Sequence, residues 1–263
     1  MPAGFTASHR GGAGSPLVLL HGFTDTWRTW ELMLPALERE RDVLALTLPG
    51  HAGGPPLPHP LTAAAVGDVV EAALDDAGLA TAAIAGNSLG GYVALELAAR
   101  RRATSVVALA PAGGWAEGDA AFRQTLTYFT DMQGLLRTAV LHAESIVSTP
   151  EGRRRATASF VESSEHISPE LIVHLMRGAA NCPGVGPMIE LAVRDGWPLE
   201  PAAITCPVRF VWGTADRILE WPRAAARYRA LFPQADWVEL DGVGHSPQLD
   251  VPLETAQLIL GHG

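Results

Sequence analysis

The chain has 263 residues, of which 48% are hydrophobic and 18% are charged, so it can bury the core of one large domain. Its formal net charge of −9 argues against nucleic acid or an anionic membrane as a main partner. All 19 residues of the Lys and Arg class are arginine, which excludes chemistry that depends on a Schiff-base lysine or a P-loop lysine.

Other features of the composition further narrow the class of protein. The two cysteines, Cys182 and Cys206, form no CxxC pair, so we expect neither a zinc site nor a disulfide framework, and no cofactor. Residues 1–12 contain no apolar stretch of the kind found in signal peptides, and no apolar run reaches the length of a membrane span. The sequence therefore predicts a cytoplasmic protein that acts on a small molecule, away from membranes, and it carries no signal of oligomeric state.

Taken in chain order, short apolar runs alternate with helical patterns, which predicts a mostly parallel sheet covered by helices. A first strand could lie near Phe5–Ser8, with Arg10–Gly14 as a turn after it. The other predicted strands are Leu17–Leu20, Val43–Leu46, Thr81–Ala85, Ser105–Leu109, Val208–Trp212 and Trp237–Leu240. The predicted helices among them are Trp30–Glu38, Ala63–Ala77, Leu89–Arg101, Pro222–Leu231 and Pro252–Leu260.

This alternation stops between the fourth and fifth of those strands. No clear strand pattern occurs from Gly113 to about Pro201, and strand rhythm returns only at Val208. The segment instead predicts helices at Ala120–Thr130, Leu135–Val147, Pro150–Glu162 and Pro169–Ala180. We therefore expect an α/β core made of residues 1–112 and 202–263, interrupted by a helical cap over residues 113–201.

The strongest chemical signal is Gly86-Asn87-Ser88-Leu89-Gly90, between a predicted strand and a predicted helix. A serine in G-x-S-x-G at such a junction sits on a sharp, strained turn, and the flanking glycines let strand and helix approach closely. The turn presents the hydroxyl to a base, and the helix N-terminus can stabilise a developing oxyanion. Ser88 is the predicted nucleophile.

A serine hydroxyl needs a base, and the base needs an acid to fix its tautomer. His245 lies in a glycine loop between the last predicted strand and the last predicted helix, and Asp216 follows the strand Val208–Trp212. The order Ser88, Asp216, His245 fits the Ser…Asp…His pattern. Asp241 is a rival acid, but its closeness to His245 in sequence points the two side chains apart.

The oxyanion site needs backbone donors on two segments. The N–H of Leu89 is the first, and Gly22 lets the chain turn after the strand Leu17–Leu20 so that the N–H of Phe23 can be the second. We interpret the neighbouring His21 as a structural histidine with satisfied hydrogen bonds rather than as a proton-transfer group.

Together these segments resemble the α/β-hydrolase family. The resemblance is carried by five motifs spread from residue 17 to the C-terminus: LVLLHGF, LPGHAGG, GNSLGG, VRFVWGTADRI and GVGHSPQLDVP. It implies an eight-stranded, mostly parallel sheet, a helical cap over the site, the triad Ser88, Asp216 and His245, and oxyanion donors at Phe23 and Leu89. The short N-terminus departs from the family, so the sheet can have fewer than eight strands, and PGHAGG departs from the more common PGHG followed by a small polar residue.

Two branches of the family bear on the reaction. GNSLGG is similar to carbon–carbon bond hydrolases, and Arg177 in the cap could bind a substrate carboxylate as in that group, although an exposed helical arginine is the simpler interpretation. A serine at the elbow argues against the dehalogenase and epoxide hydrolase branches, which use aspartate there.

Aromatic side chains in and near the cap suggest an apolar substrate pocket. Trp27, Trp115 and Phe129 are candidates to line it, although Trp27, like Trp30 and Trp221, could equally be packed in the core. Arg153–Arg155 are interpreted as a solvated face. The leading hypothesis is hydrolysis of a small, apolar carboxylic ester through an acyl-enzyme. The alternatives are a C–C, thioester or lactone hydrolase with the same triad, and a non-catalytic ligand-binding protein that uses the same fold.

Overall fold

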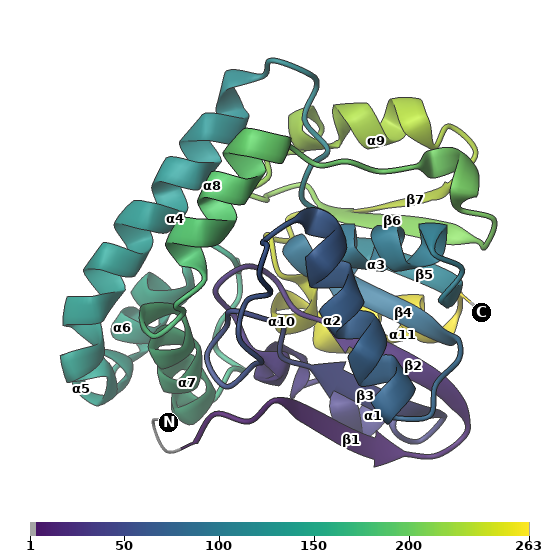
Figure 1. Cartoon of the computed structure of the whole chain (residues 1–263). Coiled ribbons are helices and arrows are strands. Elements are labelled where there is room, and N and C mark those ends of the chain that lie inside the picture. Colours follow the sequence, from purple (N-terminus) through teal and green to yellow (C-terminus); the bar gives the residue numbers. More distant parts are fainter. Residues whose placement is uncertain (1–3, 263) are drawn as a thin grey trace.

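The computed structural model describes residues 4–262, and within that range a seven-stranded sheet forms the centre of the molecule (Figure 1). The strand order is β1-β3-β2-β4-β5-β6-β7, and all neighbours are parallel except β1 and β3. The strands are β1 Ser8–Gly12, β2 Ser15–Leu20, β3 Arg41–Leu46, β4 Ala82–Asn87, β5 Ala103–Leu109, β6 Val208–Gly213 and β7 Asp236–Leu240. The predicted fold class, a mostly parallel sheet covered by helices, is confirmed.

The N-terminal edge of the sheet differs from the prediction. Residues 10–12, expected in a turn, belong to β1, which pairs antiparallel with β3 and places Ser8 opposite Leu46. The connection to β2 is made by Gly12 and Gly14, which both have positive φ angles (79° and 116°) and so allow a tight reversal. Within residues 4–262, β1 is therefore the edge strand of a sheet with seven strands rather than the eight that the family resemblance implies.

Each strand divides its side chains between two cores. Val18 and Leu20 of β2 face a cluster that contains residues of α2 (Ala63–Asp76) and α3 (Leu89–Ala99). Leu17 and Leu19 face the opposite cluster, which contains residues of α1 (Leu34–Leu37) and α11 (Pro252–Leu260). The sheet is thus covered by helices on both sides (Figure 1).

Several helix boundaries were wrong in the prediction. The helix expected over residues 30–38 is split into a 3₁₀ turn, Trp27–Trp30, and the short α1, whose first turn contains Pro35. The helix expected over residues 222–231 begins as a 3₁₀ turn, Arg223–Ala225, and continues as α9 (Ala226–Leu231). The short α10 (Pro247–Asp250), which follows His245, was not predicted.

Residues 113–201 contribute only helices and loops to the described structure, all placed between β5 and β6. The helices are α4 Ala120–Ala139, α5 Ala143–Val147, α6 Pro150–Thr157, α7 Pro169–Ala180 and α8 Val185–Asp195. One continuous α4 spans the end of one predicted helix and the start of the next, because Gly134 does not interrupt it, and α8 was missed. In Figure 1 the long α4 lies alongside α8, and both helices stand beside the carboxyl ends of the strands. That these residues act as a separate cap remains a prediction.

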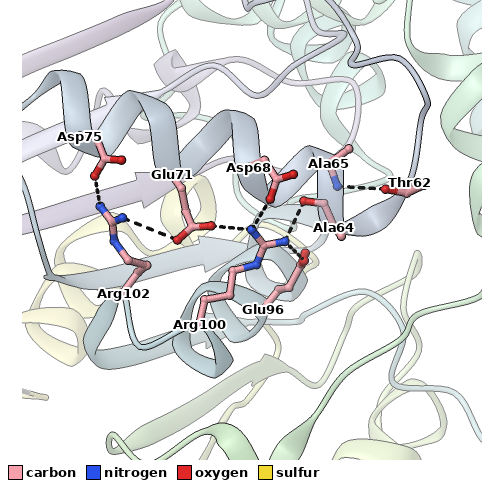
Figure 2. Close-up of polar contacts among 9 residues, drawn as sticks. All are labelled: Thr62, Ala64, Ala65, Asp68, Glu71, Asp75, Glu96, Arg100 and Arg102. Carbon is pink, nitrogen blue, oxygen red and sulfur yellow. Dashed lines mark hydrogen bonds and ion pairs between the residues drawn. The ribbon is translucent and has the colours of Figure 1, made fainter.

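Arginines at the end of α3 bind α2 to the core (Figure 2). Arg100 donates from Nη1 to Asp68 and Glu71, and from Nη2 to Glu96 and the carbonyl of Ala64, at 2.5–2.7 Å. Its guanidinium fits here because a Cβ on Gly67 would lie 2.7 Å from Nη2. Arg102 reaches the same helix through Asp75 and Glu71.

We expect Arg100→Met to destabilise the fold by about 1–3 kcal/mol, because it leaves several acceptors unpaired, including Glu96, whose pKa burial already raises. The measurement is thermal or urea unfolding at pH 7. Arg101→Met is the matched control, since Arg101 is exposed and donates to the hydroxyl of Thr205 rather than to α2; its expected cost is below about 0.5 kcal/mol. Equal losses in the two variants would show that the network does not hold α2.

Candidate active site

Ser88 occupies the strained turn that its motif predicts. It lies between the end of β4 and the start of α3, with φ 53° and ψ −114°, a backbone conformation that non-glycine residues seldom adopt. The turn needs glycine on both sides: a Cβ on Gly86 would lie 2.2 Å from the carbonyl oxygen of Gly90, and one on Gly90 would lie 2.1 Å from that of Leu20. Close packing of strand and helix therefore fixes where the Ser88 hydroxyl stands.

The predicted base and acid meet from two different loops. His245 Nδ1 lies 2.7 Å from Asp216 Oδ2, and both side chains are buried. The other oxygen of Asp216 accepts hydrogen bonds from the backbone N–H groups of Ile218 and Leu219, both at 2.8 Å. These donors hold the carboxylate in place, so its second oxygen is directed at the imidazole. Ser88 and His245 line the same cavity.

Asp241, the rival acid, lies elsewhere. It is exposed and accepts a hydrogen bond from the hydroxyl of Thr214 at 3.1 Å. The structure thus brings Asp216, and not Asp241, to the imidazole.

Backbone N–H groups lie beside Ser88 on two segments. A Cβ on Gly22 would lie 3.4 Å from Ser88 Cβ, so the loop after β2 touches the nucleophile turn, and Phe23 follows directly. Leu89 is the first residue of α3, where an N–H has no partner inside the helix. Within residues 4–262, neither of these two N–H groups donates to a protein acceptor. Both N–H groups are therefore unpaired in the described structure.

Two buried amides that sequence reasoning missed support the histidine loop. Asn87 Nδ2 donates to the carbonyl of His245 at 3.0 Å, and Gln248 Nε2 donates to Asn87 Oδ1 at 3.1 Å. Both residues lie within the motifs, next to Ser88 and three residues after His245, and that closeness was the available signal. They position the loop that carries the imidazole.

His21 has the structural role expected of it. Its Nε2 accepts from the N–H of Leu48 at 2.9 Å, so Nδ1 carries the proton and donates to the carbonyl of Gly22 at 2.7 Å. Burial lowers its pKa well below the usual range, which keeps the ring neutral. His51 packs edge-on against it, and burial lowers the pKa of His51 to about 4.

Two cavities meet at Ser88, and Phe23 and Phe129 line both, with their rings in edge-to-face contact at 5.0 Å between centroids. The smaller cavity, about 60 Å³, is apolar, and the larger, about 540 Å³, contains His245. The smaller is lined by side chains of the helical segment and α3, including Tyr92, Trp115, Leu126, Met188 and Trp197. Trp115 and Phe129, predicted pocket residues, are therefore at the cavities.

Trp27 and Arg177, the other predicted pocket residues, line neither of these cavities. The indole of Trp27 stacks on His9 of β1 and donates to Thr6, so the ring covers the sheet edge. Arg177 is half-exposed and pairs with Glu144, so its guanidinium is not beside Ser88 to bind a substrate carboxylate.

Of the remaining tryptophans, Trp30 is fully buried in the core, and Trp221 packs near Trp212 and Trp237. Within residues 4–262, no group of three or more His, Cys, Asp or Glu side chains is arranged to hold a metal ion. None of the described helices combines the length and apolarity that crossing a membrane requires.

Comparison with known proteins places this geometry in a family. The profile of the alpha/beta hydrolase family matches residues 17–258. The chain is 31% identical to epoxide hydrolase EphH of Mycobacterium tuberculosis, over 76% of this chain and 94% of that protein. It is 30% identical to a pimeloyl-[acyl-carrier protein] methyl ester esterase of Aromatoleum aromaticum, over 92% and 96% of the two chains.

Among solved structures, the chain is similar to an esterase from Thermogutta terrifontis, with a TM-score of 0.72, 22% identity, and coverage of 97% of this chain and 91% of that one. At this identity the likeness concerns the fold. The matched profile and the two relatives together establish that the chain belongs to the alpha/beta hydrolase family.

Proposed function

We propose that this hydrolase cleaves an apolar carboxylic ester through an acyl-enzyme formed on Ser88. The observation that carries the proposal is the pairing of His245 with Asp216 at 2.7 Å in a cavity that Ser88 also lines. The Ser88 hydroxyl attacks the ester carbonyl while His245 takes its proton, and Asp216 stabilises the imidazolium. The N–H groups of Phe23 and Leu89 bind the oxyanion, and water then releases the acid by the same steps in reverse.

Epoxide hydrolysis, the activity named for one relative, fits this nucleophile poorly. A carboxylate that opens an epoxide forms an ester, which water can cleave. A serine oxygen would form an ether, which has no carbonyl for water to attack. Ser88 therefore favours a carbonyl substrate, and the ester named for the other relative supplies one.

We assign the two halves of the ester to the two cavities. His245 must protonate the departing alcohol, and of these two cavities it lines only the larger. The alcohol therefore leaves into the larger cavity, and the acyl chain occupies the smaller, apolar cavity between α3, α4 and α8.

This assignment predicts the response to acyl length. In a series of p-nitrophenyl esters, each methylene buried in the smaller cavity should raise kcat/KM about fourfold, from about 0.8 kcal/mol per methylene, until the cavity is full. Leu126→Trp, which narrows that cavity, should move the optimum to a shorter chain. Met132→Trp, on the same helix but lining only the larger cavity, is the matched control and should leave the optimum in place.

An unchanged optimum in Leu126→Trp, with a shifted one in Met132→Trp, would reverse the assignment of the cavities. Equal rates from acetate to octanoate in the unaltered enzyme would contradict an enclosed acyl site. Acid quenching during turnover, followed by intact-mass measurement, tests the acyl-enzyme itself, whose expected mass gain is the acyl group less the one hydrogen that it replaces.

A further inference from the structure

Asp25 is a carboxylate in the larger cavity for which the proposed reaction has no use. It lies two residues after Phe23, and its N–H donates to the carbonyl of Gly22 at 3.2 Å, so the turn that carries the oxyanion donor also carries this side chain. Asp25 lines the cavity together with Ser88 and His245. The acid of the triad is Asp216, so Asp25 is not needed for the imidazole.

The surroundings of Asp25 stabilise a carboxylate but do not neutralise it. Its Oδ1 accepts from the N–H of Thr26 at 2.7 Å, and the hydroxyl of Thr29 donates to the same carboxyl group. Gln248 Nε2 in turn donates to the Thr29 hydroxyl oxygen at 3.2 Å, which leaves the hydroxyl hydrogen available to Asp25. In the described part of the chain, no Arg or His nitrogen lies within ion-pair distance of Asp25.

A purely local role does not account for the residue. Thr26, and not Asp25, caps the following 3₁₀ turn, since its side chain accepts from the N–H of Arg28. Burial raises the pKa of Asp25 to about 7, so keeping a carboxylate here is costly to the fold. A partly buried acidic group without a cation in the described part of the chain, at the wall of a cavity beside the nucleophile, is typical of a binding position.

The other charged side chains that line this cavity, apart from His245, are Glu151 and Arg155 of α6. Both are exposed and carry opposite charges, so the outer part of the cavity has no strong preference for either sign. Asp25 instead lies on the same turn as Gly22 and Phe23, with its N–H bonded to the Gly22 carbonyl at 3.2 Å.

We propose that Asp25 binds a cationic amine on the alcohol half of the substrate, which makes the enzyme selective for esters of amino alcohols with an apolar acyl group. This inference rests on the proposed ester hydrolysis at Ser88 and on the assignment of the larger cavity to the leaving group. The ammonium N–H donates to the carboxylate, and its charge offsets the cost of burying that carboxylate.

The test compares three nearly isosteric esters of one acid, whose alcohols end in a dimethylammonium, an isopropyl or a 1-hydroxyethyl group, each with linkers of two, three and four carbons. At the best linker length, we expect kcat/KM for the ammonium ester to exceed that for the isopropyl ester by about 10- to 100-fold. Asp25→Asn, which keeps the shape and an accepting oxygen, should reduce this ratio to near one and leave the rate on the isopropyl ester within about threefold.

Glu151→Gln is the matched control, because it removes a carboxylate from the rim of the same cavity. It should leave the ratio unchanged. A preference for the ammonium ester that survives in Asp25→Asn, or that is lost in Glu151→Gln, would overturn the proposal. So would the absence of any preference at all three linker lengths. A preference for the hydroxyl ester alone would show that Asp25 selects hydrogen-bond donors without regard to charge, which also contradicts the cationic assignment.

Failure of this inference can be told apart from failure of the proposed function. If Ser88→Ala still hydrolyses the isopropyl ester, the reaction at Ser88 is wrong. If hydrolysis of that ester depends on Ser88 while the ratio does not depend on Asp25, only the role of Asp25 is wrong.

Discussion

Ser88→Ala is expected to lower kcat/KM for ester hydrolysis by about 10⁴-fold or more. Without the hydroxyl, no acyl-enzyme forms, and the remaining oxyanion donors can assist only direct attack by water. The backbone at this position has φ 53°, so an alanine there is strained as the serine is, and the fold should be little changed.

The measurement is the rate of p-nitrophenyl ester hydrolysis by purified protein, with circular dichroism and thermal unfolding to show that the variant is folded. Traces of contaminating esterases limit the lowest hydrolysis rate that can be measured for the variant. A mock purification therefore serves as the blank. Turnover within tenfold of the unaltered enzyme, in a folded variant, would remove Ser88 from the reaction.

Asp216→Asn is expected to lower kcat by about 10²- to 10⁴-fold and to leave KM nearly unchanged. An asparagine that presents its NH₂ to His245 Nδ1 favours the tautomer with the proton on Nε2, and that tautomer cannot accept the serine proton. The backbone donors at Ile218 and Leu219 can still bind the remaining oxygen, so the loop should keep its shape.

Asp241→Asn is the matched control, because Asp241 was the rival acid in the sequence and is exposed, with Thr214 as its partner. It should keep kcat within about twofold. A severe loss in Asp241→Asn with a mild one in Asp216→Asn would mean that the wrong carboxylate has been assigned, since the pairing at 2.7 Å would then not be the productive one.

The sequence predicted the parts of the site that depend on local geometry. Ser88 could be placed because two glycines and a strand–helix junction together define one turn. Asp216 could be preferred over Asp241 because it follows a predicted strand, whereas Asp241 lies only four residues before His245, and the structure brings Asp216 to His245. The roles of these residues in catalysis await the measurements above.

Features that depend on packing between distant segments could not be predicted. Trp27 was one of the aromatic pocket candidates, but the N-terminal strand β1 supplies His9, and the indole stacks there instead. Arg177 was considered as a substrate clamp without knowledge that α5 places Glu144 beside it. The roles of Asn87 and Gln248 were missed for the same reason, since their partners come from other loops.

The prediction of secondary structure failed where weak local signals compete with contacts between distant segments. Two helices, Ala120–Thr130 and Leu135–Val147, were predicted where one continuous α4 packs against α7 and α8. The pair Gly12 and Gly14 was interpreted as part of a longer turn, because pairing with β3 is a long-range contact that the local pattern does not contain. Secondary-structure propensity depends on the residues of one segment, whereas the elements that pack against the segment decide whether it becomes helix, strand or turn.

The central claim, that Ser88 is an activated nucleophile held beside two oxyanion donors, is tested most directly by covalent labelling with an alkyl fluorophosphonate. We predict a mass gain of one phosphonyl group per chain, located on the peptide that contains Ser88. No labelling is expected in Ser88→Ala, and labelling should be much slower in His245→Ala. A folded, unaltered protein that is not labelled, or that is labelled equally in Ser88→Ala, would contradict the claim.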